Sequence, residues 1–412
     1  MKKYGLLGKK LGHSYSVPIH HALGNGEYKL CERQPQEIEQ LLSDPDLGGL
    51  NVTIPYKQEV MQYLDSIDPA AREIGAVNTI VRRDGSLIGY NTDHIGFCRM
   101  LEHSGIGVGG KKALVLGSGG ASKTAVVCLR RLGASSVTVI SREGENNYLN
   151  LSRHSDAQLI VNCTPVGMYP DTLVSPVDLT EFPLCEGVAD MIYNPLRTAL
   201  LMQAEKLGIK TAGGLLMLTS QAVAAHDLFF DTKVEAGTDL SLASALRRDS
   251  ENIVLVGMPG SGKSTVGAAL ARLSGREAVE IDALIAQKAG KTIPEIFECD
   301  GEDAFRRLES DVLREESKEK AKIIITGGGA VTREENYPAL HQNGKIYEIT
   351  RDINKLATCG RPLSKDIDTL RRMYEVRRPM YEAFRDVSVA NDNAPEQTAQ
   401  EIWRDFCENT GY

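Results

Sequence analysis

Short apolar runs alternate with helical patterns along most of this 412-residue chain. The clearest runs are 113–116, 136–140, 159–162, 252–256 and 322–326, and each ends in, or is followed by, Gly, Ser or Asn. Runs that are apolar and mostly β-branched along their whole length predict strands buried on both faces, as in a parallel sheet. Their alternation with helices predicts the α/β fold class.

The length of the chain predicts two or three domains, because a single hydrophobic core rarely serves 412 residues. The Gly-rich stretch 105–112 predicts one boundary. The polar stretch 235–251 has no strong period and precedes a strand, so it is the best candidate for a linker.

Composition narrows the class of protein. Hydrophobic residues make up 42% and charged residues 25%, which excludes wholesale disorder. The net charge of −8 argues against nucleic acid as the main partner, and no apolar run is long enough to span a bilayer. The eight cysteines are scattered without a C-x-x-C pair, which indicates a reducing compartment. We therefore expect a cytoplasmic location and no membrane partner.

A Gly-rich turn after the run 252–256 carries the strongest motif. Residues 257–265 read GMPGSGKST, which matches G-x-x-x-x-G-K-[ST] between a predicted strand and a predicted helix. In such a P-loop, backbone N–H groups surround the phosphates, Lys263 reaches the β- and γ-phosphates, and the Ser264 hydroxyl can ligate Mg²⁺. The motif predicts ATP or GTP binding without specifying the second substrate.

Further motifs in this half of the chain narrow the choice of its second substrate. Residues 280–282 read EID, 327–329 read GGG, 361–363 read RPL, and Arg306 and Arg377 stand in family order. With these motifs the region from 252 onward resembles shikimate kinase. The resemblance implies MgATP as the phosphoryl donor. It also implies that Lys263 and Asp282 are the catalytic residues of this half. It also implies the following sites: ATP at Gly260, Ser261, Gly262, Lys263, Ser264, Thr265 and Arg361; shikimate at Asp282, Arg306, Gly328 and Arg377; and Mg²⁺ at Ser264, with Glu280 acting through water. Glu280 replaces the usual aspartate, a departure that bears on the magnesium site.

A second Gly-rich turn, GSGG at 117–120, follows the run 113–116. Such a turn alone is a weak dinucleotide signal, since any tight turn favours glycine. The next strand ends at Ser141-Arg142, where an arginine favours the 2′-phosphate of NADP. An exposed loop arginine explains Arg142 equally well, and the adjacent Glu143 would repel a phosphate.

Short polar clusters complete the first half of the chain: HSYS at 13–16, NVTIPYK at 51–57, GAVNT at 75–79, NTD at 91–93, NCTPVGM at 162–168, DMIYNP at 190–195 and GGLLMLTSQA at 213–222. This ordered set resembles shikimate dehydrogenase over roughly residues 1–230. The resemblance implies that Lys57 and Asp93 are the catalytic pair. It implies substrate contacts at Ser14, Ser16, Thr53, Asn78, Asp93, Tyr193 and Gln221. It implies NADP contacts at Gly117, Gly119, Gly120, Ala121, Arg142, Thr164, Met191 and Gly214.

The two resemblances predict an α/β chain with three domains. An α/β substrate domain would span 1–105, with helices from about 213–232 packing back on it. A Rossmann-like NADP domain would span 106–234, a linker 235–251, and a P-loop kinase domain with a parallel sheet 252–412. Both halves point to shikimate, so we expect a bifunctional enzyme that uses NADP(H), ATP and Mg²⁺ on the small molecules 3-dehydroshikimate and shikimate. The oligomeric state is left open.

Two alternatives remain. One is a quinate/shikimate dehydrogenase that uses NAD and is fused to a small-metabolite kinase. The other is a sensor that binds shikimate and nucleotides without turnover. A sensor would be expected to lack Lys57, Asp93, Lys263 or Asp282, and all four are present.

Overall fold

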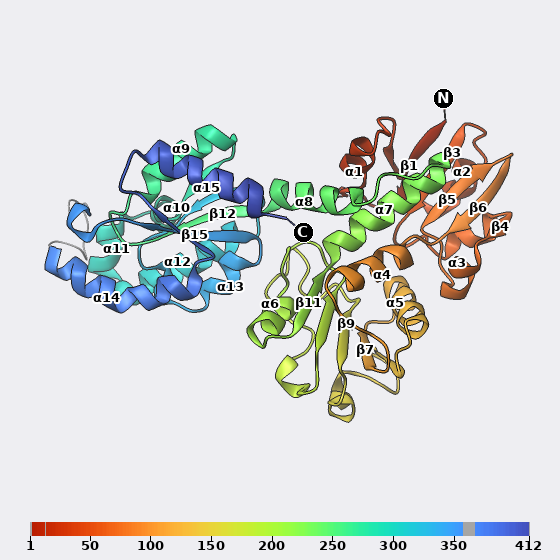
Figure 1. Cartoon of the computed structure of the whole chain (residues 1–412), viewed down its shortest axis with the longest axis horizontal. Coiled ribbons are helices and arrows are strands. Elements are labelled where there is room, and N and C mark those ends of the chain that lie inside the picture. Colours follow the sequence, from red (N-terminus) through yellow and green to blue (C-terminus); the bar gives the residue numbers. More distant parts are fainter. Residues whose placement is uncertain (1, 13, 357–366, 412) are drawn as a thin grey trace.

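Three separate β-sheets organise the chain along its length (Figure 1). The computed structural model describes residues 2–12, 14–356 and 367–411. All five apolar runs form strands, so the predicted α/β class with parallel sheets is confirmed. Within the described ranges, no helix combines the length and apolarity needed to cross a membrane.

The first sheet is mixed and has the strand order β2-β1-β3-β5-β6-β4. Strand β1 pairs in parallel with β2 and β3, whereas β5 pairs antiparallel with β3 and β6. Its strands are β1 (Lys3–Gly8), β2 (Lys29–Glu32), β3 (Leu47–Val52), β4 (Ser66–Ile67), β5 (Thr79–Arg83) and β6 (Ser86–Tyr90). Its helices are α1 (Ser16–Ala22), η1 (Pro35–Glu37), α2 (Ile38–Leu42), η2 (Glu59–Tyr63), α3 (Pro69–Ile74) and α4 (Asp93–His103).

The second sheet is parallel and has the order β11-β10-β9-β7-β8. Its strands are β7 (Lys112–Leu116), β8 (Ser136–Ile140), β9 (Leu159–Asn162), β10 (Gly187–Asp190) and β11 (Lys210–Gly213). Its helices are α5 (Gly120–Arg131), η3 (Tyr148–His154), η4 (Leu179–Glu181) and α6 (Ala199–Lys206). The long helix α7 (Gly214–Phe230) leaves this sheet and packs on α4, α1, β3 and β5 of the first domain.

The stretch predicted as a linker is the helix α8 (Thr238–Ser250), which runs from the first two domains to the third (Figure 1). Leu240, Ala243 and Leu246 of α8 pack with Leu215 and Leu216 of α7. The connection between the two halves is therefore a packed helix with its own apolar face. Because α8 also contains many polar residues, its apolar face gives no strong helical period in the sequence.

The third sheet is parallel throughout and has the order β13-β14-β12-β15-β16. Its strands are β12 (Asn252–Val256), β13 (Ala278–Glu280), β14 (Ile323–Ile325), β15 (Gly344–Thr350) and β16 (Val387–Ala390). Its helices are α9 (Lys263–Ser274), α10 (Ile281–Ala289), α11 (Ile293–Cys299), α12 (Glu302–Glu316), η5 (Ala330–Thr332), α13 (Asn336–His341), η6 (Ile353–Lys355), α14 (Ile367–Phe384) and α15 (Pro395–Asn409).

Polar contacts also join the second domain to the third. The backbone N–H of Arg197 donates to the carbonyl of Gln342 (2.9 Å), and that of Leu196 donates to Asn343 Oδ1 (2.9 Å). The Arg197 guanidinium donates to Glu251 Oε1 at 3.1 Å, and Glu251 is only 1% exposed. The third domain is thus held against the second by directed hydrogen bonds as well as by α8.

Candidate functional site

A cavity of about 540 Å³ lies between the first and second domains. Every residue that we expected to contact the dehydrogenase substrate lines this cavity, and so does Lys57. These residues are Ser14, Ser16, Thr53, Lys57, Asn78, Asp93, Tyr193 and Gln221. The residues come from separate loops of the first domain and from the second domain and α7, so only the folded chain brings them together.

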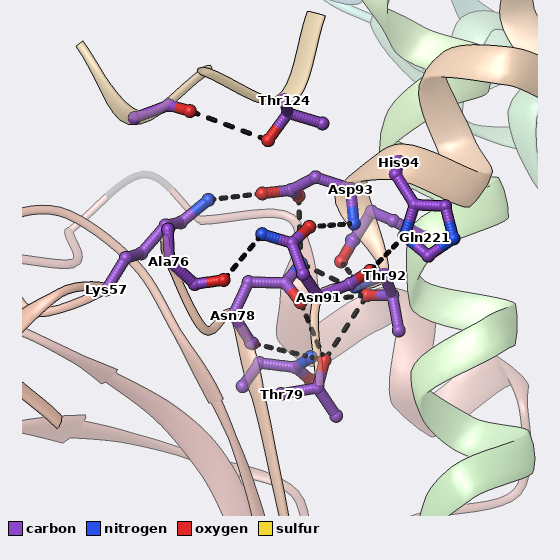
Figure 2. A network of polar contacts seen from close by, with 12 residues as sticks. Lys57, Ala76, Asn78, Thr79, Asn91, Thr92, Asp93, His94, Thr124 and Gln221 are labelled. Carbon is purple, nitrogen blue, oxygen red and sulfur yellow. Dashed lines mark hydrogen bonds and ion pairs between the residues drawn. The ribbon is translucent and has the colours of Figure 1, made fainter. Parts of the chain in front are cut away.

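The centre of this cavity is an ion pair between Lys57 and Asp93 (Figure 2). Lys57 Nζ donates to Asp93 Oδ2 at 2.7 Å, and Asn78 Nδ2 donates to Asp93 Oδ1 at 2.8 Å. Asp93 is the first residue of α4, where the helix dipole favours a negative charge. The side chains of Lys57 and Asp93 are 22% and 13% exposed, so the pair is shielded and yet reachable from the cavity.

A buried hydrogen-bond network holds Asn78 and Asp93 in place (Figure 2). The backbone N–H of Thr92 donates to Asn78 Oδ1 (2.6 Å), and that of Asp93 donates to Asn91 Oδ1 (3.1 Å). The Thr92 hydroxyl in turn donates to Gln221 Oε1 of α7 at 3.4 Å. Sequence reasoning assigned no role to Asn91 or Thr92, although both belong to the NTD motif. The sequence signal that could have identified Asn91 and Thr92 is their position as short polar residues directly before Asp93.

Two hydroxyls reach the cavity from the start of α1, one from Ser14 in the preceding loop and one from Ser16, the first residue of the helix. Ser14 Oγ accepts from the backbone N–H of Ser16 at 3.1 Å, which fixes the two serines relative to each other. Asn51 also lines the cavity and was not singled out from the sequence; its amide donates to Thr79 Oγ1 (3.2 Å). Burial raises the pKa of Tyr193, so its hydroxyl stays protonated as a hydrogen-bond donor.

The residues expected to hold NADP follow the carboxyl ends of β7, β8, β9 and β10, with Gly214 at the start of α7. A Cβ atom built on Gly119 or Gly120 would meet nothing within 4 Å, so the start of α5 has room for a phosphate group. Gly117 has a φ of +101°, which favours glycine. Ala121, Met191 and Gly214 line the same cavity as Lys57.

The other two NADP candidates lie further along the edge of this sheet. Arg142 is exposed just after β8, and Thr164, after β9, donates from its hydroxyl to Asn162 Oδ1 at 2.7 Å. The connection from β8 to β9 contains the short 3-10 helix η3 where a Rossmann domain commonly has an α-helix.

A second cavity of about 770 Å³ lies in the third domain. It is lined by most of the predicted kinase residues: Gly260, Gly262, Lys263, Ser264, Thr265, Glu280, Asp282, Arg306, Gly328 and Arg377. Ser261, in the same loop, is instead buried, and its carbonyl accepts from Asn391 Nδ2 at 2.7 Å. Arg361 lies outside the described residues. Sequence reasoning missed Arg351, which also lines this cavity just after β15.

The P-loop of this cavity connects β12 to α9. Lys263 Nζ donates to the carbonyls of Gly257 (2.8 Å) and Met258 (3.1 Å), so the ammonium group bends back over the loop. Burial raises the pKa of Glu280, and the neighbouring Ser264 hydroxyl opposes that shift. A hydroxyl beside a carboxylate is a suitable donor set for Mg²⁺ with water ligands.

Each of the three glycines 327–329 has a different close neighbour where a Cβ atom would lie. A Cβ atom on Gly327 would lie 2.7 Å from Glu309 Oε1 and 2.8 Å from Asp282 Oδ1. On Gly328 it would lie 2.6 Å from the Pro259 ring of the P-loop, and on Gly329 it would lie 2.1 Å from Arg306 Nη2. The turn therefore lets the P-loop, Asp282 and Arg306 converge on one point.

Two buried arginines stand at this turn. Arg377 Nη1 donates to the Gly328 carbonyl at 2.9 Å, and Arg306 Nη1 donates to Glu309 Oε2 at 2.6 Å. Burial raises the pKa of Glu309, although the charge of Arg306 acts in the opposite direction. Glu309 was not assigned a role from the sequence, and in the structure its carboxylate orients Arg306.

Two family models match this chain. Residues 6–80 match the model described as the shikimate dehydrogenase substrate binding domain. Residues 259–407 match the model described as shikimate kinase.

Individual relatives cover the first half. The shikimate dehydrogenase (NADP(+)) of Caldicellulosiruptor bescii is 40% identical over 261 residues, which span 56% of this chain and 90% of the relative. The crystal structure of shikimate dehydrogenase 1 from Peptoclostridium difficile is 37% identical, with a TM-score of 0.55 over 60% of this chain and 98% of that one. The structure from Thermus thermophilus, in complex with NADP(H) and shikimate, is 31% identical, with a TM-score of 0.54 over 60% of this chain and 99% of that one.

The three sheets and the two cavities define the class of the protein as a dinucleotide-dependent oxidoreductase joined to a P-loop phosphotransferase. The comparisons agree with this division of the chain. The chain belongs to the shikimate dehydrogenase family and carries a shikimate kinase domain after it.

Proposed function

We propose that this chain catalyses two consecutive reactions on one metabolite. The first is the reduction of 3-dehydroshikimate to shikimate with NADPH, in the cavity around Lys57 and Asp93. The second is the transfer of the γ-phosphoryl group of ATP to the 3-hydroxyl of shikimate, in the cavity around Lys263 and Asp282. The main support is that two separate cavities of one chain each gather the residue set of a family that handles shikimate.

In the first reaction, bound NADPH supplies the hydride that attacks the ketone carbon. The ketone oxygen gains negative charge as the carbon–oxygen double bond opens, and it must receive a proton. The Lys57 ammonium stabilises that charge and donates the proton. Asp93 holds the ammonium in position, and Asn78 holds Asp93. The hydroxyls of Ser14 and Ser16 bind the substrate carboxylate. The hydroxyl groups on the substrate ring are bound by Thr53, Asn78, Asp93, Tyr193 and Gln221.

When NADP is bound, the open start of α5 at Gly119 and Gly120 would hold its pyrophosphate. The other residues that would contact the cofactor are Gly117, Ala121, Thr164, Met191 and Gly214, and Arg142 would pair with the 2′-phosphate. An Arg142→Ala variant is expected to weaken NADPH binding far more than NADH binding. Equal losses for both cofactors would contradict this role, and a wild-type preference for NADH would implicate Glu143.

In the second reaction, bound MgATP supplies the phosphoryl group. Arg306 and Arg377 bind the shikimate carboxylate, and Asp282 accepts the proton of the attacking hydroxyl. Lys263 would bind the phosphates of the nucleotide, and Ser264 and, through water, Glu280 would hold the magnesium ion. A new oxygen–phosphorus bond forms as the bond to the ADP leaving group breaks.

The experiment is an assay of the whole chain with 3-dehydroshikimate, NADPH, ATP and Mg²⁺ that follows NADPH oxidation and ADP release. We expect both signals, and ADP release alone when shikimate replaces 3-dehydroshikimate and NADPH is omitted. Parallel assays with NADH and quinate test the first alternative. Binding without turnover at either site would favour the sensor.

We also propose the following domain bounds: a substrate domain of 1–105 completed by α7, an NADP domain of 106–234, the connector 235–251 and a kinase domain of 252–412.

We further propose a cytoplasmic location, because the seven described cysteines all carry free thiols.

A further inference from the structure

A loop of the kinase domain reaches the dehydrogenase half. Residues 317–322 connect α12 to β14, and Lys320 Nζ donates to the Tyr15 hydroxyl of the first domain at 2.6 Å. The neighbouring Glu319 accepts from the Tyr169 hydroxyl of the second domain at 3.5 Å. One kinase loop thus contacts both domains that enclose the dehydrogenase cavity.

The hydrogen bonds at Tyr15 have a defined direction. Ser250 Oγ donates to the carbonyl of Leu246 at 2.7 Å, so its oxygen is left to accept from the Tyr15 hydroxyl at 3.1 Å. The Tyr15 hydroxyl therefore donates to Ser250, and its own oxygen accepts from the charged Lys320. A hydrogen bond with a charged donor is stronger than one between neutral groups.

Tyr15 connects this contact to the substrate cavity. It lies between Ser14 and Ser16, which both line the cavity, and it is the N-cap residue of α1. Its ring packs edge-on against Tyr193, another lining residue, with 5.7 Å between the ring centroids and an interplanar angle of 74°. Tyr15 itself does not line the cavity, and its neighbours Ser14, Ser16 and Tyr193 connect it to the substrate-binding region.

The backbone that presents Lys320 is fixed inside the kinase domain. Asn252 Nδ2 donates to the Glu319 carbonyl (2.8 Å), and Asn252 Oδ1 accepts from the backbone N–H of Lys322 (2.9 Å). The backbone N–H of Ala321 donates to the Ser250 carbonyl at the end of α8 (3.0 Å). Asn252 is fully buried, so the position of Lys320 depends on the folded kinase domain.

From these contacts we infer that Lys320 is a positioning residue for the dehydrogenase reaction. Through it the kinase domain stabilises residues 14–16, which we call the serine loop, in their substrate-binding conformation. This inference rests on the proposed reduction of 3-dehydroshikimate. A loop that spends less time in the competent conformation raises the apparent dissociation constant by the same factor. It leaves the rate of the bound complex unchanged, so the effect belongs to KM rather than to kcat.

The test uses the full chain with Lys320→Met, Lys320→Arg, Tyr15→Phe and the double variant Tyr15→Phe/Lys320→Met. We expect Lys320→Met to raise KM for 3-dehydroshikimate by about three- to tenfold, with kcat changed by less than about twofold. Lys320→Arg keeps a charged donor and should restore most of the loss. The loss in the double variant should be smaller than the sum of the two single losses, because both changes remove the hydrogen bond between Lys320 and Tyr15. Only Tyr15→Phe also removes the hydrogen bond to Ser250, and only Lys320→Met also removes the ammonium group 4.7 Å from the Tyr15 ring centroid.

Lys288→Met is the matched control, since Lys288 pairs with Glu315 inside the kinase domain at 2.9 Å. It should leave reductase parameters unchanged, and Lys320→Met should leave kinase parameters and the thermal unfolding midpoint unchanged. A wild-type KM in Lys320→Met, additive losses in the double variant, or a parallel loss of kinase activity would each overturn the positioning role. Absence of reductase activity in the wild-type chain would instead overturn the proposed function.

Discussion

The two carboxylate oxygens of Asp93 have separate partners, and this determines how the dehydrogenase site responds to mutation. Lys57 donates to one oxygen and Asn78 to the other. Removal of Lys57 therefore leaves Asp93 anchored by Asn78 and by the start of α4. The substrate contacts of the serine loop do not depend on Lys57.

Lys57→Ala should lower kcat for ketone reduction by roughly 10²–10⁴-fold, because the proton donor is lost. Substrate binding should remain measurable by titration, and kinase activity of the same chain should be unchanged. Lys29→Ala, which removes a lysine that is 73% exposed, is the control. Near-normal reduction by Lys57→Ala would exclude Lys57 from proton transfer.

Arg377→Ala should raise the kinase KM for shikimate by roughly ten- to hundredfold and leave the KM for ATP nearly unchanged, because a charged hydrogen-bond donor to the carboxylate is lost. The adjacent Arg378 is 62% exposed, so Arg378→Ala should change neither constant. A selective loss of ATP affinity in Arg377→Ala would reverse the assignment of the two binding regions.

Arg306→Ala should combine the same rise in KM with a loss of stability. Glu309 is buried and has Arg306 as its ion-pair partner, so the substitution leaves a buried carboxylate unpaired. Removing one member of such a pair costs about 3–5 kcal/mol. Denaturant unfolding of both variants tests this difference: Arg306→Ala should have the lower free energy of unfolding. Equal stability of Arg377→Ala and Arg306→Ala would contradict the role of Glu309.

At the scale of elements, the candidate functional residues lie where strands end and helices begin. Asp93 begins α4, Lys263 begins α9, and the glycines 327–329 follow β14. Parallel strands bring their carboxyl ends to one edge of a sheet, so loops distant in sequence converge there. The kinase cavity depends on the close approach of two such loops at Gly328.

Gly328→Ala should abolish most kinase activity, at least about tenfold in kcat/KM, because its Cβ would lie 2.6 Å from the Pro259 ring and 2.9 Å from the Pro259 backbone nitrogen. The P-loop would have to move to relieve the overlap. Reductase activity of the same chain is the internal control. Gly26→Ala, at a site with open space around it, should affect neither reaction.

At the scale of the whole molecule, Glu251 joins the halves. It accepts from Arg197 of the second domain (3.1 Å) and from Arg247 of α8 (3.2 Å). Burial alone would raise the pKa of Glu251, but the two arginines outweigh burial and lower it below its usual value. The ionised carboxylate therefore contributes stability at neutral pH.

This contribution should disappear in acid. Because the folded-state pKa is depressed, it is complete above the unfolded-state value of about 4.5 and is lost as pH falls through the folded-state value. Glu251→Gln should reduce the free energy of unfolding by about 1–3 kcal/mol at pH 7, since Arg197 and Arg247 keep some solvent contact. The difference from wild type should shrink progressively below pH 4.5. The exposed Glu298→Gln control should show no such pH-dependent difference.

Much of this protein was predictable from its sequence, because the information was local. Strands 136–140, 159–162 and 252–256 lie where the apolar runs predicted them. The P-loop context of Lys263 is also local, since a strand, a glycine turn and a helix follow one another directly. Ordered motifs named most of the residues that line the two cavities, although they left out Asn51 and Arg351.

Contacts between distant segments required the tertiary structure. The sequence could not show that Lys57 meets Asp93 rather than solvent, or that Glu309 serves Arg306, because each pairing depends on how separate loops pack. It indicated a polar linker at 235–251 and could not reveal that α8 packs on α7. Nor could it place Lys320 beside Tyr15, 305 residues earlier in the chain. These contacts depend on how whole domains pack against each other, and no local sequence pattern encodes that packing.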